Sequence, residues 1–193
     1  MYKTFMKHAE KLTNSDPAKV KPALKAVKHF KNGDAAVTDS HRLYYAKEIH
    51  DKGDVLLTPK GKKLDENYPD ITRLMPSNDP KQILTLKVDE LIKGVDIILA
   101  ASKYVSESPQ MTYEENSLFF EARHEEVKAS YDLSESVETK FISNAAYWMD
   151  ALKLFKAFKY TEVDFLYYGP VRPFILKSKD EKLTALILPM RRY

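Results

Sequence analysis

The sequence contains no cysteine and no hydrophobic run long enough to cross a bilayer. Since none of its 193 residues is a cysteine, disulfide bonds and thiolate zinc sites are excluded. No apolar stretch approaches the roughly 20 residues that a membrane-spanning helix needs. The segment from Met1 to Leu12 also lacks the uninterrupted apolar core of a secretion signal. These absences predict a cytoplasmic protein that does not associate with membranes.

The signatures of common catalytic and metal sites are missing as well. The chain has no Gly-x-Ser-x-Gly elbow, no phosphate-binding loop and no His-Glu-x-x-His helix. The histidines show no ligand-like pairing: they are His8, His29, His41, His50 and His124. Asp39, Ser40 and His41 are the residue types of a hydrolase triad, but they are neighbours on an expected strand, where side chains alternate in direction. We therefore expect a protein that is not an enzyme and needs no metal or cofactor, with a hydrolase as the least favoured alternative.

Charge is present but unevenly spread. The net charge is only +3, yet residues 1–31 hold eight lysines against two acids, and residues 107–138 hold nine acids against two bases. Such asymmetry can provide a basic face for a polyanion. The simpler interpretation of charge alone is a mixed, solvated surface.

The hydrophobic pattern predicts an α+β protein. With 44% hydrophobic residues, the chain can bury a substantial core. Helices are expected over residues 1–13, after a cap at Asp89 and after a cap at Asn144. Strands are expected over residues 24–30, 35–49, 83–86, 118–124, 127–133, 137–142, 163–168, 174–178 and 183–189. Residues 50–80 contain four prolines and predict an irregular linker, which divides the chain into residues 1–78 and 79–193.

Three short segments stand out from this pattern. They are Thr-Asp-Ser-His-Arg-Leu at residues 38–43, Tyr-Pro-Asp-Ile-Thr-Arg-Leu-Met-Pro at residues 68–76, and Leu-Ile-Leu-Pro-Met-Arg-Arg-Tyr at residues 186–193. Each has an ordinary explanation by itself: a turn that satisfies its own backbone, a proline-rich linker, and core filler.

Taken together, in this order and spacing, the three segments resemble the bacterial DNA polymerase III β sliding clamp family. The family has glycine where this chain has Ser40, and phenylalanine where it has Tyr68. Residues 86–91, 144–152 and 169–173 resemble further family segments. Nothing resembles the first clamp domain, and the middle domain is cut to about half. The resemblance implies a DNA-clamp-like domain with helices on one side of an antiparallel sheet, preceded by a truncated clamp half-domain.

The resemblance also implies a groove that docks linear peptide motifs of DNA polymerase, the clamp loader or repair proteins. Its wall is assigned to Thr38, His41, Arg42, Leu43, Pro69, Arg73, Leu74, Leu188, Pro189, Met190 and Arg191. The chemistry is sensible, because leucine, proline and methionine offer apolar surface to a peptide anchor. The cationic side chains can bind the peptide's polar and acidic groups.

A second implied function is to encircle double-stranded DNA without reading its sequence. The lysines expected on helices, and so near phosphates, are Lys3, Lys7, Lys11, Lys93, Lys153, Lys156 and Lys159; a solvated helix face is an equal alternative. Three half-domains per chain would make a closed tetramer arithmetically possible, but we expect a monomer or small oligomer. Two interpretations stay open: a processivity factor on DNA, and a decoy that forms no ring and sequesters clamp-binding proteins. A phage or mobile element would be a suitable source for either protein.

Overall fold

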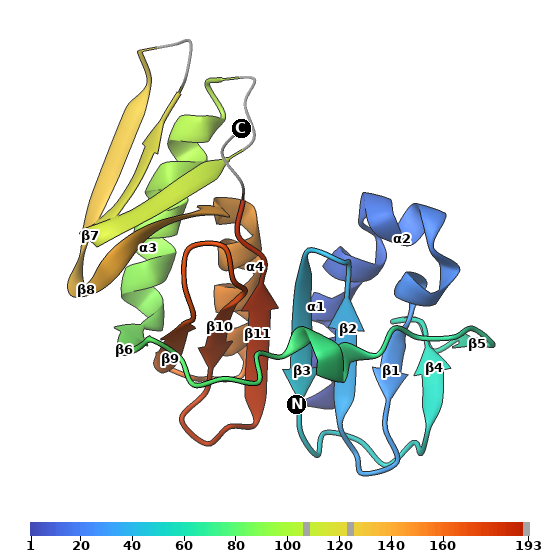
Figure 1. Cartoon of the computed structure of the whole chain (residues 1–193). Helices are drawn as coiled ribbons and strands as arrows, with labels where there is room; N and C mark the ends of the chain where they lie inside the picture. Colours follow the sequence, from blue (N-terminus) through green and yellow to red (C-terminus); the bar gives the residue numbers. More distant parts are fainter. Residues whose placement is uncertain (106–108, 123–125, 191–193) are drawn as a thin grey trace.

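The computed structural model of the chain describes residues 1–105, 109–122 and 126–190, and the side chain of residue 139 is not described. Figure 1 shows the order of its elements. The helices are α1 (Tyr2–Thr13), α2 (Asp16–Val20), α3 (Val88–Ser102) and α4 (Ala145–Ala157), with short 3-10 helices η1 (Pro22–Lys25) and η2 (Ile71–Leu74). The strands are β1 (Val27–His29), β2 (Ala35–Thr38), β3 (Arg42–Ala46), β4 (Val55–Leu57), β5 (Lys63–Leu64), β6 (Gln82–Lys87), β7 (Gln110–Glu121), β8 (Lys128–Asn144), β9 (Glu162–Tyr167), β10 (Phe174–Lys177) and β11 (Leu183–Ile187).

One antiparallel sheet of nine strands runs through the molecule in the order β5-β4-β1-β2-β3-β11-β10-β9-β6. Its central junction pairs β3 with β11, so that Leu43 lies opposite Leu186 and Arg42 lies opposite Ile187. Residues from the first quarter of the chain and from its C-terminal end therefore become neighbours. This junction is what brings distant sequence segments to one place.

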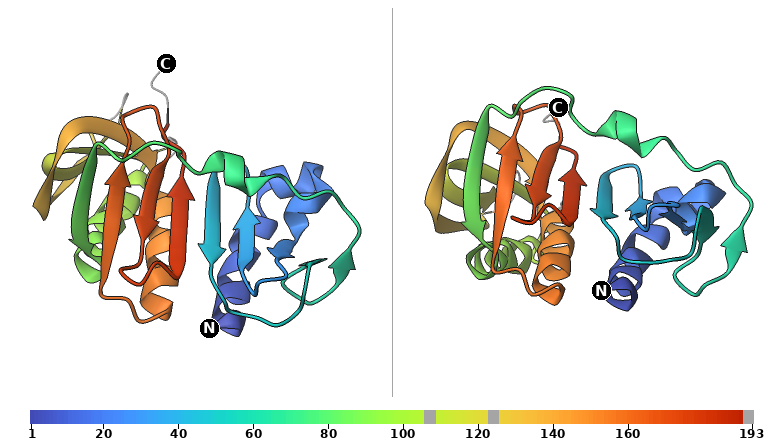
Figure 2. Two further views of the ribbon diagram at one scale, coloured as in Figure 1. Left: turned by 60° about the horizontal axis from the view of Figure 1, so that its bottom comes forward. Right: turned by 90° about the horizontal axis from the view of Figure 1, so that it is seen from below.

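The two faces of this sheet are covered differently. Figure 2 shows the long helices on one face and the η2 segment crossing the opposite face. On the helical face, Trp148, Leu152 and Phe155 of α4 are fully buried in the main core. Their spacing of three and four residues places them on one side of the helix. On the other face, Ile71 of η2 packs into a smaller core with Leu43.

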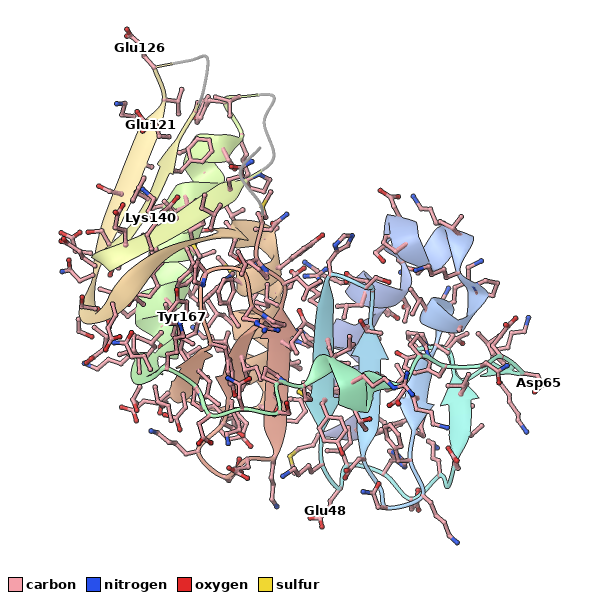
Figure 3. The ribbon with its side chains drawn as sticks, viewed as in Figure 1. Glu48, Asp65, Glu121, Glu126, Lys140 and Tyr167 are labelled. Carbon is pink, nitrogen blue, oxygen red and sulfur yellow. The ribbon has the colours of Figure 1, made fainter. Side chains whose placement is uncertain are left out.

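The strands β7 and β8 form a separate two-stranded ribbon that packs against α3. Gly94 permits this contact, because a Cβ atom there would lie 2.7 Å from the Tyr131 ring on β8. Charged residues including Glu121, Glu126 and Lys140 lie on this ribbon (Figure 3).

The predicted α+β fold with helices on one side of antiparallel sheet is confirmed, with local corrections. The run 35–49 is not one strand, because the chain reverses at residues 39–41 to form the β2–β3 hairpin. The strands expected at 127–133 and 137–142 are one strand, β8. Asp89 lies in the first turn of α3 and Lys87 occupies the cap position, whereas Asn144 caps α4 as predicted by accepting a hydrogen bond from the Ala146 amide.

The expected strand at 24–30 contains η1 before the short strand β1. The expected linker is also less irregular than predicted, because residues 50–80 contain β4, β5 and η2. Backbone pairing of Leu56 with Leu64 holds β5 against β4.

Candidate functional site

The three singled-out segments meet at one small cleft. It is lined by residues from the β2–β3 hairpin, from η2 and from the end of β11: Thr38, Ser40, His41, Arg42, Leu43, Leu74, Leu186 and Leu188. The pairing of β3 with β11 supplies the floor of the cleft, and η2 supplies one wall. Residues separated by up to about 150 positions in the sequence thus form one surface.

The hairpin turn at the cleft satisfies its own backbone. The Asp39 carboxylate accepts hydrogen bonds from the His41 and Arg42 amides, each at 3.0 Å. The Thr38 hydroxyl donates to the Arg42 carbonyl at 2.7 Å. Ser40 adopts the left-handed conformation with φ of +74°, where glycine is favoured. The rigid turn leaves Ser40 and His41 exposed at the rim of the cleft.

Arg42 is held by partners within the protein. Its side chain is 6% exposed and forms ion pairs with Asp39 at 3.0 Å and with Asp150 at 2.8 Å. The guanidinium also lies over the ring of Tyr147, 4.4 Å from the ring centre. These contacts connect the hairpin to α4. The sequence predicts that Arg42 binds polar groups of a ligand; in the structure Arg42 lines the cleft, and its charge is paired with two carboxylates of the protein.

The linker reaches the cleft through Tyr68 and η2. The Tyr68 hydroxyl accepts a hydrogen bond from the Thr38 amide at 3.0 Å, and burial raises the pKa of this phenol. Asp70 caps η2 by accepting from the Thr72 amide at 3.1 Å. Ile71 is buried while Leu74 is 39% exposed beside the cleft. The segment 68–76 is therefore anchored at Tyr68 and Ile71, and it exposes Leu74 beside the cleft.

Pro69 and Arg73 lie near the cleft but do not line it. Both are exposed, and Arg73 pairs with Asp70 at 3.0 Å. That ion pair is on the surface, so it contributes little stability and leaves the guanidinium accessible.

The C-terminal segment runs along the other side of the cleft. The Leu188 amide donates to the His41 carbonyl, and the Met190 amide donates to the Ile142 carbonyl, both at 2.9 Å. Leu188, Pro189 and Met190 are half-buried, and of these Leu188 lines the cleft. Arg191, which was also predicted to line the site, lies outside the described residues.

The cleft is almost closed in this structure. Its volume is about 20 Å³, enough for about one water molecule but not for a leucine side chain. Leu74 is the most exposed apolar residue of the lining, so a shift of its side chain is the simplest way to open the cleft. Sequence reasoning missed the contributions of Ser40 and Leu186 to the lining. It also missed Tyr147, whose ring stacks on His41 with ring centres 6.1 Å apart.

Six of the seven lysines expected on helices do lie on helices and are exposed there. Exposed lysines on α1, α3 and α4 are Lys3, Lys7, Lys11, Lys93, Lys153 and Lys156. Lys159 lies beyond the end of α4, in the left-handed conformation with φ of +66°, so its placement on a helix was wrong. Lys11 pairs with Asp150 and Lys156 pairs with Asp89.

His8 of α1 lies among charged residues of α1 and α4. Its pKa is lowered, first by burial and then by the positive charge of Lys7, with smaller contributions from Lys11 and Lys153.

The described part of the chain shows neither a metal cluster nor a spanning helix. Across residues 1–105, 109–122 and 126–190, no three His, Cys, Asp or Glu side chains gather as metal ligands. His124 is outside these ranges. Among the helices that the structure describes, none has the length and apolar character to cross a membrane.

The chain is similar in sequence to bacterial β sliding clamps. The β sliding clamp of Staphylococcus aureus is 33% identical over 144 residues, which cover 67% of this chain and 35% of that protein. The Staphylococcus epidermidis β sliding clamp is 34% identical over 139 residues, with the same coverage of both. No family model matches the chain. The chain thus spans about a third of the length of these curated relatives.

Bacterial clamps are also among the solved structures that resemble this chain. The DNA polymerase III β chain from Streptococcus pneumoniae superposes with a TM-score of 0.80 at 19% identity, covering 98% of this chain and 63% of that one. The Helicobacter pylori β clamp bound to a DNA ligase peptide has a TM-score of 0.71 at 18% identity, with coverage of 98% and 63%. The chain therefore has the clamp fold over nearly all of its length.

Proposed function

We propose that this chain is a non-enzymatic, clamp-like docking protein that binds short linear peptides of replication or repair proteins at the cleft between β3, β11 and η2. The observation that carries the proposal is the convergence of all three clamp-like segments on that cleft. A clamp with this fold has been crystallised with a DNA ligase peptide. DNA polymerase, the clamp loader and repair proteins are the partner classes that the resemblance favours.

The cleft offers an apolar centre with a polar rim. Leu43, Leu74 and Leu188 provide the surface for a leucine or phenylalanine anchor, and His41 provides a polar group at the rim. Burying one such anchor contributes about 2 kcal/mol, so two or three anchors and a few hydrogen bonds are compatible with micromolar affinity, roughly −8 kcal/mol. Part of that energy is used to move Leu74 away from the closed cleft.

The hydrolase alternative lacks a converging triad. Ser40 and His41 are neighbours on an exposed turn, and Asp39 accepts from backbone amides through one oxygen and pairs with Arg42 through the other. The Asp39 carboxylate is therefore engaged by the turn and cannot orient the His41 ring as a triad requires.

The peptide-binding proposal is tested by fluorescence anisotropy with a labelled Gln-Leu-x-Leu-Phe-type peptide. Leu74→Ala combined with Met190→Ala should weaken binding at least tenfold, because both side chains come from segments that flank the cleft. The matched control is Ile83→Ala combined with Val171→Ala, which removes apolar side chains that are 58% and 73% exposed elsewhere. Equal affinity of the two double variants, both correctly folded, would remove the cleft from the proposal.

We also propose that the lysines of α1, α3 and α4 face the phosphates of duplex DNA. The proposal rests on their exposed positions on these three helices. Contacts of this kind are independent of sequence and weaken with salt.

Two assemblies are compatible with this function. A closed ring would be retained on circular DNA and released when the DNA is cut, whereas a decoy would bind peptides without such retention. The basic segment 1–31 and the acidic segment 107–138 could meet between copies, since opposite charges favour docking. Light scattering and retention on closed circular DNA separate the two, and our preference remains a monomer or small oligomer.

The division into residues 1–78 and 79–193 also remains a proposal. The nine-stranded sheet runs across it at the β3–β11 pairing. Limited proteolysis tests it, since cleavage within residues 75–81 should release two protected fragments.

A further inference from the structure

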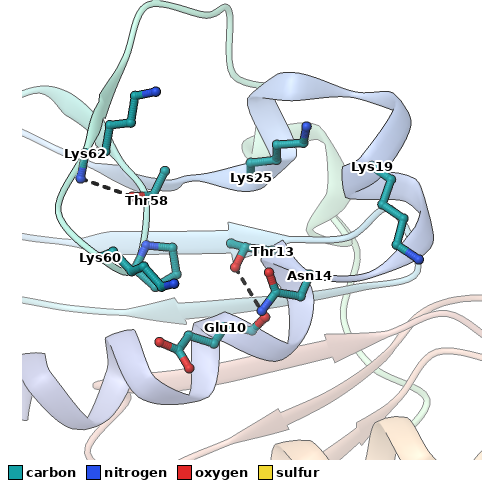
Figure 4. Close-up of a pocket in the computed structure, with 9 residues that line it drawn as sticks. Glu10, Thr13, Asn14, Lys19, Lys25, Thr58, Lys60 and Lys62 are labelled. Atoms are coloured by element: carbon teal, nitrogen blue, oxygen red, sulfur yellow. Dashed lines mark hydrogen bonds between the residues drawn. The ribbon is translucent and has the colours of Figure 1, made fainter.

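A cavity of about 590 Å³ lies away from the cleft, between the end of α1, the α2–η1 segment and the turn that joins β4 to β5. Figure 4 shows lysines arranged around it from both sides. The residues that line it are Glu10, Thr13, Asn14, Lys19, Lys25, Thr58, Pro59, Lys60 and Lys62. No residue of this cavity lines the peptide cleft.

The fold holds the two sides of this cavity in fixed positions. The Thr58 amide donates to the Lys62 carbonyl and the Gly61 amide donates to the Thr58 carbonyl, both at 2.8 Å. The Lys62 amide donates to the Thr58 hydroxyl at 3.0 Å. Gly61 has φ of +85°, which the turn needs and which glycine adopts without strain. The lysines of the turn are therefore carried on a rigid backbone.

Strand pairing brings this turn to the lysines near the N-terminus. β4 pairs with β1 through Val27 and Leu57, and β1 follows directly after η1, which carries Lys25. Lys25 and Lys60, far apart in sequence, therefore face the same cavity.

The positive charge of the cavity is largely unneutralised. Over the ranges that the structure describes, Lys25, Lys60 and Lys62 have no carboxylate within 4.0 Å, and Lys19 pairs only with the exposed Asp16. Glu10 is the one acid among the lining residues. Gathering like charges without counter-charges is unfavourable, and a bound anion relieves the repulsion.

The basic surface continues beyond this cavity. A neighbouring hollow of about 450 Å³ shares Glu10, Pro59 and Lys60 with it. That hollow adds the lysines Lys3, Lys7 and Lys52. A ligand with several spaced anionic groups could thus follow one strip of lysines along α1.

We propose that this cavity binds closely spaced phosphate groups, either those of a single nucleic acid strand or those of a free polyphosphate. The ammonium group of lysine is a compact positive charge with no planar geometry to match, so it can bind a tetrahedral phosphate from several directions. Asn14 and Thr58 add neutral hydrogen-bond donors. Pro59 is the one apolar side chain of the lining, so the cavity provides no pocket for a peptide anchor. The inference does not depend on peptide docking, and the lysines of the cavity are different from those proposed to face duplex DNA; only Lys3 and Lys7 of the neighbouring hollow belong to both sets.

The test uses the full chain with two probes, a fluorescein-labelled 12-nucleotide oligothymidylate and inorganic tripolyphosphate. The variant Lys25→Gln/Lys60→Gln/Lys62→Gln removes three exposed charges from the cavity. The control Lys87→Gln/Lys103→Gln/Lys182→Gln removes three exposed charges elsewhere. The cavity variant should bind at least tenfold more weakly than the control, and its salt-dependence slope for the oligonucleotide should fall by about 2.

A third variant separates the effect of charge from any effect on folding. Glu10→Gln removes the one acid of the lining and should strengthen binding about twofold, as expected for one charge several ångströms away in water. Binding of the oligonucleotide alone identifies a nucleic acid strand, and binding of tripolyphosphate alone identifies a free polyphosphate. Equal losses in the two triple variants, or no binding of either probe at low salt, would overturn the proposal.

Discussion

The ion pair between Arg42 and Asp150 is the contact on which the position of the hairpin turn at the cleft depends most. Arg42 and Asp150 are 6% and 12% exposed, and Asp39, which also pairs with Arg42, is 1% exposed. Asp150→Ala removes one of the two carboxylates and leaves the buried guanidinium with Asp39 alone. Losing a charged hydrogen bond in such a setting costs about 2–3 kcal/mol of unfolding free energy.

A double-mutant cycle isolates this contact. Asp150→Ala, Arg42→Met and the double variant are unfolded in urea and followed by the fluorescence of Trp148, the single tryptophan, which is buried in α4, the helix that also carries Asp150. The expected coupling energy is about 1.5–3 kcal/mol. Lys11→Ala is the control, because Lys11 pairs with the same carboxylate but is 59% exposed, and it should cost less than about 1 kcal/mol. A coupling below about 0.5 kcal/mol would refute the structural role that we assign to Arg42.

Three further predictions concern stability. Ser40→Gly should raise the unfolding free energy by about 0.5 kcal/mol. Glycine relieves about 1–2 kcal/mol of backbone strain at φ of +74°, which outweighs the cost of about 0.5–1 kcal/mol from the greater entropy of the unfolded chain. A lower unfolding free energy in urea would contradict this prediction. Burial, and then the charge of His50, lower the pKa of His29 to about 4. Because the unfolded chain takes up this proton near pH 6.5, the unfolding free energy should fall between about pH 6.5 and 4 by up to about 1.4 kcal/mol per pH unit, and a slope unchanged in His29→Gln would argue against it. Gly94→Ala should lower the melting temperature, because its Cβ would lie 2.7 Å from Tyr131 and 3.0 Å from Leu118, an overpacking cost of about 1–3 kcal/mol; an unchanged or higher melting temperature would show that the ribbon relaxes freely.

The elements with a clear period and a clear cap could be predicted from the sequence. Trp148, Leu152 and Phe155 recur at helical spacing after the Asn144 cap, and α4 begins after that residue. The strand at residues 35–49 could not be divided correctly, because apolar residues continue on both sides of the reversal. The turn is made by side-chain hydrogen bonds of Thr38 and Asp39, which apolar alternation does not reveal.

The long strand β8 was divided wrongly for a related reason. The polar run Ser134-Glu135-Ser136 is typical of a turn, yet these residues continue the strand. The irregularity lies in this run itself, because Ser117 pairs with Asp132 and Glu115 pairs with Val137, which leaves more residues on β8 than on β7 between the two pairs. A bulge inserts extra residues without ending the strand, and a polar run in the sequence does not distinguish such a bulge from a turn.

The segments that form the site could be predicted from the sequence, but the side-chain contacts within it could not. The resemblance of three motifs to one family indicated that they would meet. The pairing of Arg42 with Asp150 could not be foreseen, because it joins residues 108 positions apart through the docking of a hairpin on a helix. The basic cavity was missed for the same reason, since Lys25 and Lys60 approach each other only through the pairing of β1 with β4.

The central claim, peptide docking at the cleft, is tested most directly by a ¹H–¹⁵N correlation spectrum of the full chain titrated with an unlabelled Gln-Leu-x-Leu-Phe-type peptide. We expect the amide signals of Ser40, Leu74 and Leu188 to shift together and to saturate at micromolar peptide, while those of Lys25 and Lys60 stay in place. Shifts confined to other surfaces, or no shifts at millimolar peptide, would contradict the account.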